Sequence, residues 1–131
     1  MRRDHLGPLA AVMGFGAIYD LAFGGAILVV PRATSSLLRI PLPDDPFYLR
    51  LNAVFLLLLG ALYVLPALRP ERFHPMAPIA AAGRVLGGAA FALAWHAGRP
   101  AAFLVLGLAD LILASLTFAA WGRARGGSPS P

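Results

Sequence analysis

The chain has 131 residues, of which 59% are hydrophobic and 13% charged, and its mean hydropathy is +0.74. Soluble domains carry about 25% charged residues, so the composition indicates an integral membrane protein. The net charge of +5 comes from eleven arginines and no lysine, against six acids. Because nearly all these arginines lie outside the apolar segments, we expect lipid headgroups and not nucleic acid as their partners. The chain has no cysteine, which excludes disulfides, thiolate catalysis and cysteine-based zinc or iron–sulfur sites.

Four apolar segments are each long enough to cross the hydrocarbon core of a bilayer. They cover residues 8–30, 47–68, 76–96 and 101–121. The second and third segments are joined by a short, proline-rich connection, which predicts that they are antiparallel neighbours. We therefore predict an all-α, up-down-up-down bundle of four transmembrane helices. The bundle forms a single domain over residues 1–121, and a basic tail rich in Gly, Ser and Pro, residues 122–131, is expected to be disordered.

The stretch between the first two segments has a different character. Residues 32–40 mix apolar side chains with arginines and serines, which is typical of a short amphipathic piece in the headgroup region. Three prolines then mark residues 41–46 as a loop, in which an aspartate is a candidate cap for the next helix. The first segment is longer than the apolar core of a secretory signal and has no clean cleavage site after it, so we expect it to be retained.

The third segment carries an arginine, Arg84, close to its middle. A lone cation at that depth costs about 2.5–3.5 kcal/mol on insertion scales, so it needs a partner. The acids that lie equally deep are Asp20 in the first segment and Asp110 in the fourth. We therefore predict a buried polar triad of these three residues. Small residues one turn away from each charge would let neighbouring helices approach closely; they include Gly16, Gly24, Ala80, Gly88, Gly107 and Ala114.

One arginine between two carboxylates leaves a net negative charge in a medium of low dielectric constant. One of the aspartates is therefore expected to hold a proton near neutral pH. A carboxyl group of that kind suits proton-coupled transport or intramembrane acid–base chemistry. The alternative is a structural ion network that fixes which helices pack together and in which register.

The other polar residues give weaker predictions. Arg50 and Asn52 are candidates for a polar entrance on the outward side, with interfacial anchoring as the alternative. The histidines, His5, His74 and His96, lie at segment ends, and the last two are more typical of interfacial caps than of heme or metal ligands. The sequence therefore predicts no metal site and no cofactor.

Two tyrosines and a glycine pair receive packing roles. Tyr19 points about 100° away from its neighbour Asp20 on the helix, so we expect its ring to pack against other side chains or to contact lipid. Tyr63, near a segment end, is expected to be an interfacial anchor. Gly83 and Gly87 form a GxxxG pair, which favours helix packing and allows a homo-oligomer.

Four spans in this length, with Gly83-Arg84-Val85-Leu86-Gly87-Gly88 in the third and Gly107-Leu108-Ala109-Asp110 in the fourth, resemble the small bacterial four-helix membrane proteins of the DoxX-like type. The resemblance covers most of the hydrophobic part of the chain. It implies a membrane partner of respiratory or redox systems, often without an activity of its own. The chain is also similar in size to small multidrug-resistance transporters, which carry an essential acid in the first helix, where this chain has Asp20. The Arg84 counter-ion and the longer first loop argue against that match.

The arginines outside the spans favour one orientation. Six of them fall on the side of the two termini and four on the other. This bias favours a cytoplasmic position for both termini and leaves dual topology as the alternative. With the resemblance, this predicts an integral protein of the bacterial inner membrane.

The functional hypotheses follow from the triad and from the lack of a catalytic motif. The leading one is a non-enzymatic protein that serves as an accessory subunit of a membrane complex or binds a hydrophobic small molecule. Its expected partners are the lipid bilayer, a membrane protein or a second copy of the chain, and a hydrophobic ligand. The alternatives are a small proton-coupled transporter that uses Asp20 or Asp110, and an intramembrane enzyme acting on an isoprenoid, sterol-like or quinone substrate. The enzyme needs a pocket beside the triad large enough for a ring or a chain.

Overall fold

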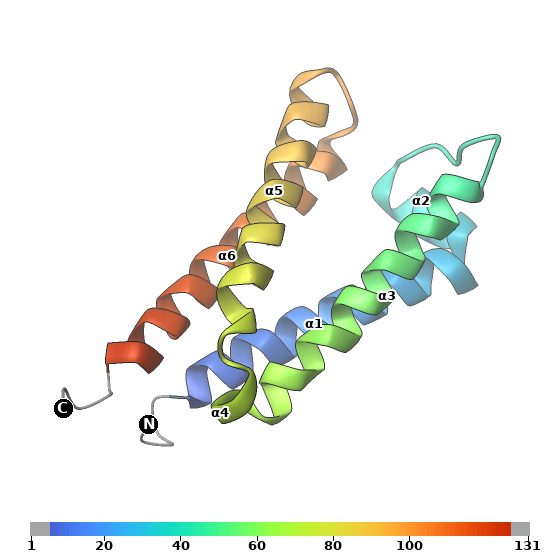
Figure 1. Ribbon diagram of the computed structural model, residues 1–131. Helices are drawn as coiled ribbons and strands as arrows, with labels where there is room; N and C mark the ends of the chain where they lie inside the picture. Colours follow the sequence, from blue (N-terminus) through green and yellow to red (C-terminus); the bar gives the residue numbers. More distant parts are fainter. Residues whose placement is uncertain (1–5, 127–131) are drawn as a thin grey trace.

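The protein is all-α in the computed structural model, which describes residues 6–126 (Figure 1). Its helices are α1 (Gly7–Val29), α2 (Pro31–Leu38), α3 (Phe47–Leu68), α4 (Pro70–Phe73), α5 (Met76–His96) and α6 (Ala101–Gly126). Four of them, α1, α3, α5 and α6, are long and apolar enough to cross a membrane. The predicted fold class, an all-α protein with four candidate membrane spans, is confirmed.

Proline and aspartate mark the helix boundaries. Pro31 and Pro70 are the first residues of α2 and α4, where the missing N–H costs no helical hydrogen bond. The predicted amphipathic piece is α2, which ends where Arg39 adopts a left-handed conformation with φ of 54°. At the start of α3, the N-cap position is Pro46, which provides no side-chain cap, but the backbone N–H of Phe47 donates to Oδ1 of Asp45 at 2.9 Å, so this aspartate satisfies the first N–H of the helix.

The last helix is longer than predicted. α6 continues to Gly126, so the first part of the stretch predicted as a tail, residues 122–131, is helical, and the rest lies outside the described residues. Two interactions support this extension. The guanidinium of Arg125 lies 4.7 Å from the ring centre of Trp121, and Ala124 is buried in the core. Arginines in the last turn also interact favourably with the helix dipole.

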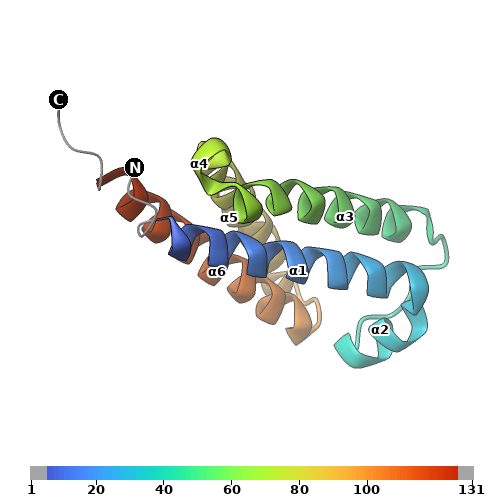
Figure 2. The same ribbon diagram turned by 90° about the horizontal axis from the view of Figure 1, so that it is seen from below.

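The four long helices form two hairpins. α1 packs along α3, and α5 packs along α6 (Figure 1). We call the end that carries α4 the closed end, because the two hairpins meet there, and the end that carries α2 the open end, because they diverge towards it. In Figure 2, α1 crosses α6, and this contact joins the hairpins. A buried core near the closed end takes side chains from all four long helices and from Leu6, which precedes α1. Its other members are Leu9, Met13, Ala17, Tyr63, Ala77, Ala80, Ala120 and Ala124.

The second and third spans run antiparallel, as predicted, but they are not closely packed neighbours, because α3 and α5 barely touch (Figure 1). The glycines explain this. On α3, a Cβ at Gly60 would lie 3.0 Å from the backbone nitrogen of Leu21 in α1. On α5, a Cβ at Gly88 would lie 3.0 Å from the carbonyl oxygen of Gly107 in α6. The glycine surface of α3 therefore faces α1, and the glycine surface of α5 faces α6, so the closest helix contacts form within each hairpin and not between α3 and α5.

Candidate functional site

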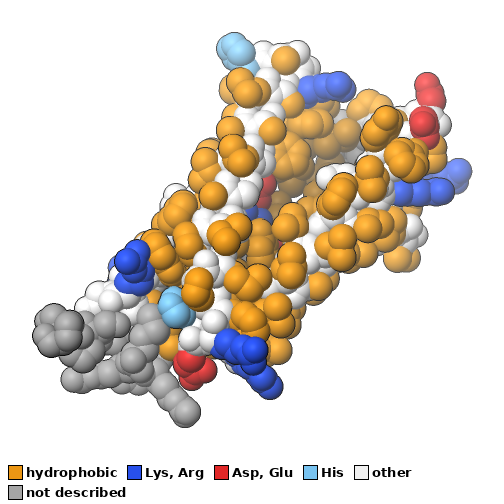
Figure 3. Space-filling model, in the orientation of Figure 1, with side chains coloured by type: hydrophobic (Ala, Val, Ile, Leu, Met, Phe, Trp, Pro, Cys, Tyr) orange, Lys and Arg blue, Asp and Glu red, His pale blue; other side chains and the backbone are white. Residues whose placement is uncertain are grey.

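A cavity of about 660 Å³ lies between the two hairpins. Large apolar side chains from both hairpins line most of it, among them Phe23, Leu59, Leu62, Ile79, Phe91 and Phe103. Figure 3 shows the two hairpins covered with hydrophobic side chains, and charged atoms are visible deep in the space between them. The polar groups of the cavity therefore sit inside a largely apolar wall.

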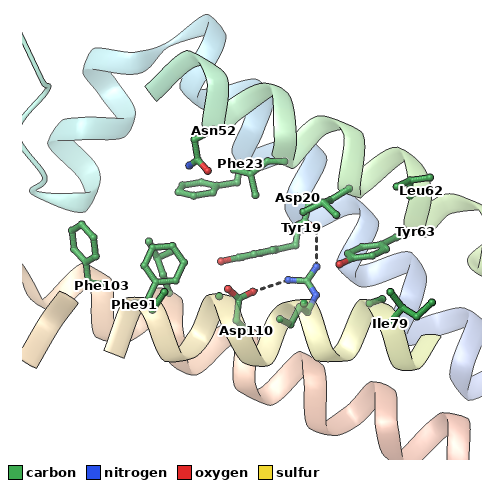
Figure 4. A pocket seen from close by; sticks show the side chains of 18 of the residues that line it. Tyr19, Asp20, Phe23, Asn52, Leu62, Tyr63, Ile79, Phe91, Phe103 and Asp110 are labelled. Atoms are coloured by element: carbon green, nitrogen blue, oxygen red, sulfur yellow. Dashed lines mark hydrogen bonds and ion pairs between the residues drawn. The ribbon is translucent and has the colours of Figure 1, made fainter. Parts of the chain in front are cut away.

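The predicted triad lies in this wall, and its three members are in direct contact (Figure 4). One terminal nitrogen of Arg84, Nη2, lies 2.8 Å from Oδ2 of Asp20, and the other, Nη1, lies 2.7 Å from Oδ1 of Asp110. The side chains of Arg84 and Asp20 are 7% and 4% exposed, and that of Asp110 is 13% exposed. Short, charge-assisted hydrogen bonds of this kind are the strong ones in proteins.

The triad takes one member from each of three helices, which gives its two ion pairs different roles. Asp20 lies on α1, Arg84 on α5 and Asp110 on α6. The Arg84–Asp110 pair therefore lies within the α5/α6 hairpin, whereas the Arg84–Asp20 pair joins the two hairpins across the cavity.

Glycines make room for the triad. Nη2 of Arg84 also donates to the backbone carbonyl of Gly16 at 3.3 Å, and a Cβ on that glycine would lie 3.1 Å from the same nitrogen. A Cβ on Gly24 would lie 2.9 Å from the carbonyl oxygen of Ala53 in α3. The predicted face of small residues around Asp20 is thus used twice, once by the arginine and once by the neighbouring helix.

The GxxxG pair on the third span has a different role from the predicted one. A Cβ on Gly83 would meet no atom within 4 Å, and a Cβ on Gly87 would lie 3.3 Å from Oδ2 of Asp110. Both glycines line the cavity. Their lack of side chains keeps space open beside the triad, and the close helix contact is made one residue further along, at Gly88.

Two tyrosines, for which the sequence predicts other roles, flank the guanidinium of Arg84. Tyr63 was expected at the membrane interface, which is wrong: it is 7% exposed, and its ring centre lies 5.1 Å from Cζ of Arg84. Tyr19 lines the cavity, with its ring centre 5.6 Å from the same carbon. The burial of Tyr63 could have been predicted from the helical period, because this residue shares a face of α3 with the small residues Ala53 and Gly60, both of which are buried.

Of the two residues predicted to form a polar entrance, one lines the cavity and one does not. Asn52 lines the cavity at its open end, as an entrance residue would, whereas Arg50 is exposed and does not line it. His74 is the C-cap residue of α4, and its Nδ1 lies 3.2 Å from the carbonyl oxygen of Glu71. His96 lies in the last turn of α5. His5 lies outside the described residues. Within residues 6–126, no three histidines, cysteines or acids are grouped as a metal site would require.

A second, smaller cavity of about 200 Å³ adjoins the first at the open end. Five residues line both cavities: Phe23, Asn52, Phe91, Phe103 and Leu106. Most of the remaining wall is built from α2 and from the loop that follows it, including Ser35 and Pro41, and Ile27 of α1 and Leu49 of α3 complete it. The two cavities therefore share a wall that includes three aromatic rings, and the second cavity lies against the segment expected at the outward membrane surface.

Neither a protein-family model, nor a curated protein, nor a solved structure matches this chain. The resemblance to DoxX-like proteins stays a prediction from sequence.

Proposed function

We propose that this protein binds a small hydrophobic molecule inside the membrane, in the cavity between its two hairpins. The observation that carries the proposal is the cavity itself, about 660 Å³ of apolar space with the triad in its wall. Ligand sites in proteins have volumes of about 300–1,000 Å³ and combine an apolar lining with a few polar groups that fix the orientation of the ligand. This cavity has both features.

The position of the triad supports binding more than a purely structural role. A structural ion pair needs only to be enclosed by packed side chains. Here Asp20, Arg84 and Asp110 all line the cavity, and the two glycines beside them leave its space unfilled. A ligand that enters between the hairpins would meet the triad directly.

Proton-coupled transport is the second candidate, and one observation favours it. Two carboxylates from different hairpins share a single arginine, so a proton on Asp20 would weaken the ion pair that joins the hairpins. On this hypothesis, Asp20→Asn and Asp110→Asn abolish proton-dependent uptake into proteoliposomes while the protein stays folded. Unchanged flux in both variants would rule it out.

The accessory-subunit and intramembrane-enzyme hypotheses stay predictions, and the cavity supplies the pocket that the enzyme requires.

The binding proposal can be tested by filling the cavity. Gly83→Leu adds a side chain to a cavity-lining position at which a Cβ meets nothing within 4 Å. Gly25→Leu is the matched control, because its Cβ is equally free and it does not line either cavity. The protein, in nanodiscs, is exposed to a photoreactive long-chain alcohol, and the labelled residues are mapped by mass spectrometry.

We expect labelling of cavity residues such as Leu59 and Ile79 that Gly83→Leu strongly reduces and Gly25→Leu leaves unchanged. The proposal is wrong if neither this alcohol nor its amine and carboxylate analogues gives labelling that depends on position 83.

A further inference from the structure

Resting on the proposed function, we infer that the ligand of the cavity is a membrane-soluble amine: an apolar body with a protonated amino group that binds against Asp20 and Asp110. Three independent observations carry this assignment. They are the charge of the triad, its unused acceptor oxygens, and the aromatic rings beside it.

The charge of the cavity wall favours a cation. Two carboxylates and one guanidinium leave one negative charge to be balanced, either by the proton expected on one aspartate or by a cation bound in the cavity. Of the residues described, Arg84 is the only lysine or arginine that lines the cavity, so no further positive charge offsets it. In an apolar cavity this charge is weakly screened, and a cationic head group would complete the neutralisation. An anionic head group would be repelled.

The hydrogen bonds of the triad leave two acceptors open. Arg84 uses Oδ2 of Asp20 and Oδ1 of Asp110, and no described residue donates to the other oxygen of either carboxylate. Neither of these oxygens is fully enclosed by protein atoms, although Asp20 as a whole is only 3% exposed. A carboxylate oxygen in an apolar site needs a hydrogen-bond donor. An ammonium group supplies three.

The arginine, in contrast, is shared between both carboxylates. Three of its five N–H groups donate, to Asp20, to Asp110 and to the carbonyl of Gly16, and the rings of Tyr19 and Tyr63 flank the guanidinium. A carboxylate or phosphate head group that approached the remaining N–H groups would lie beside two carboxylates of like charge, which repel it. The carboxylates, not the cation, therefore set the preference of the site.

Aromatic rings extend the site away from the triad. Figure 4 shows Tyr19, Phe23, Phe91 and Phe103 around the space next to Asp110. Phe91 and Phe103 meet edge to face, with ring centres 5.8 Å apart. The faces of such rings attract ammonium groups and also pack against apolar chains. The same cavity thus suits both ends of an amphiphilic amine.

The experiment compares three photoreactive probes that share one alkyl chain and differ only in the head group: an amine, an alcohol and a carboxylate. The full-length protein is held in nanodiscs of zwitterionic lipid, and each probe is adjusted to the same mole fraction in the membrane. We expect half-maximal labelling of cavity residues by the amine at about one tenth of the mole fraction that the alcohol needs, with the carboxylate weakest. Asp110→Asn should lower this amine-to-alcohol ratio towards one while the alcohol still labels.

The outcomes separate the inference from the proposed function. Equal or stronger cavity labelling by the alcohol or the carboxylate in the parent protein overturns the amine assignment but leaves the binding site in place. The amine assignment is also wrong if Asp110→Asn does not reduce the preference for the amine probe, because the triad is then not the cause of that preference. If that variant fails to fold, the series on the parent protein decides alone. If no probe labels the cavity in a way that depends on Gly83→Leu, the proposed function fails.

Discussion

At the scale of single residues, the identity of Arg84 matters as much as its charge. A guanidinium has two terminal nitrogens in one plane, which lets it hold carboxylates on two different helices at 2.8 and 2.7 Å. A lysine ammonium is a single point and has no such fork. The arginine thereby links three helices, with Gly16 supplying a further acceptor from α1.

The first prediction concerns the free energy of unfolding of triad variants. Arg84→Ala should destabilise the protein by about 3–5 kcal/mol, because it leaves two buried carboxylates without their cation. Adding Asp20→Asn and Asp110→Asn to Arg84→Ala should recover part of that loss, since the carboxylates no longer carry charge. Unfolding in detergent or nanodiscs, followed by circular dichroism, measures both effects.

Arg84→Lys supplies the control, because it keeps the charge and loses the fork. It should fall between the parent protein and Arg84→Ala. If all these variants unfold like the parent, the triad contributes little to stability, and its burial has to be explained by binding or proton transfer alone.

At the scale of helices, glycine positions decide which pairs pack closely. The GxxxG spacing in the third span draws attention to Gly83 and Gly87, yet the contact with α6 is made through Gly88. Spacing alone cannot separate these positions, because adjacent residues lie about 100° apart on a helix and both faces carry small side chains. The distinction depends on the direction from which α6 approaches.

The second prediction tests this assignment with one substitution at two positions of α5. In Gly88→Ala, the new Cβ would lie 2.8 Å from Cγ of Leu111 and 3.0 Å from the carbonyl oxygen of Gly107. Because that oxygen belongs to the backbone, the helices must separate, and we expect a loss of about 1–3 kcal/mol in unfolding free energy. Gly83→Ala meets no atom within 4 Å and should be neutral or slightly stabilising, because alanine favours the helix. Equal stability of the two variants would show that α5 and α6 pack differently.

At the scale of the whole molecule, the sequence predicts the spans and the triad better than it predicts the cavity. Span limits follow from hydropathy, and the triad follows from the cost of an unpaired charge in the membrane, so Asp20, Arg84 and Asp110 can be identified without coordinates. The cavity depends on α3 and α5 not packing together, although a short connection joins them. Nothing local in the sequence encodes that separation, and for the same reason Tyr63 was misplaced at the interface.

The third prediction concerns orientation, and the lack of cysteine in the chain makes it simple to test. α2 and α4 lie at opposite ends of the molecule, and both are outside the long helices (Figure 1). With the termini in the cytoplasm, an impermeant maleimide added to intact cells should label Ser36→Cys in α2 and should not label Arg72→Cys in α4. Labelling of the second variant should require permeabilised cells. Labelling of both variants from outside would indicate dual topology.

The fourth prediction follows from the way the hairpins are joined. The buried core holds them together near the closed end. Further along the cavity, the hairpins are linked by the Asp20–Arg84 ion pair and by the longer hydrogen bond from Arg84 to the carbonyl of Gly16. Loss of that ion pair should therefore act mainly at the open end. With spin labels on Tyr48→Cys in α3 and Leu93→Cys in α5, both exposed positions at the open end, Asp20→Asn should give longer and broader distances by pulsed electron paramagnetic resonance.

Two controls restrict that interpretation. Labels at the closed end, on Leu68→Cys in α3 and Arg123→Cys in α6, should report unchanged distances in the Asp20→Asn variant, because the core there is intact. Asp110→Asn breaks only the ion pair within the α5/α6 hairpin, so it should leave the distance at the open end as it is in the parent. If Asp110→Asn widens the open end as much as Asp20→Asn does, the triad acts as one unit, and the separation of the hairpins depends on its total charge and not on the bond that crosses the cavity.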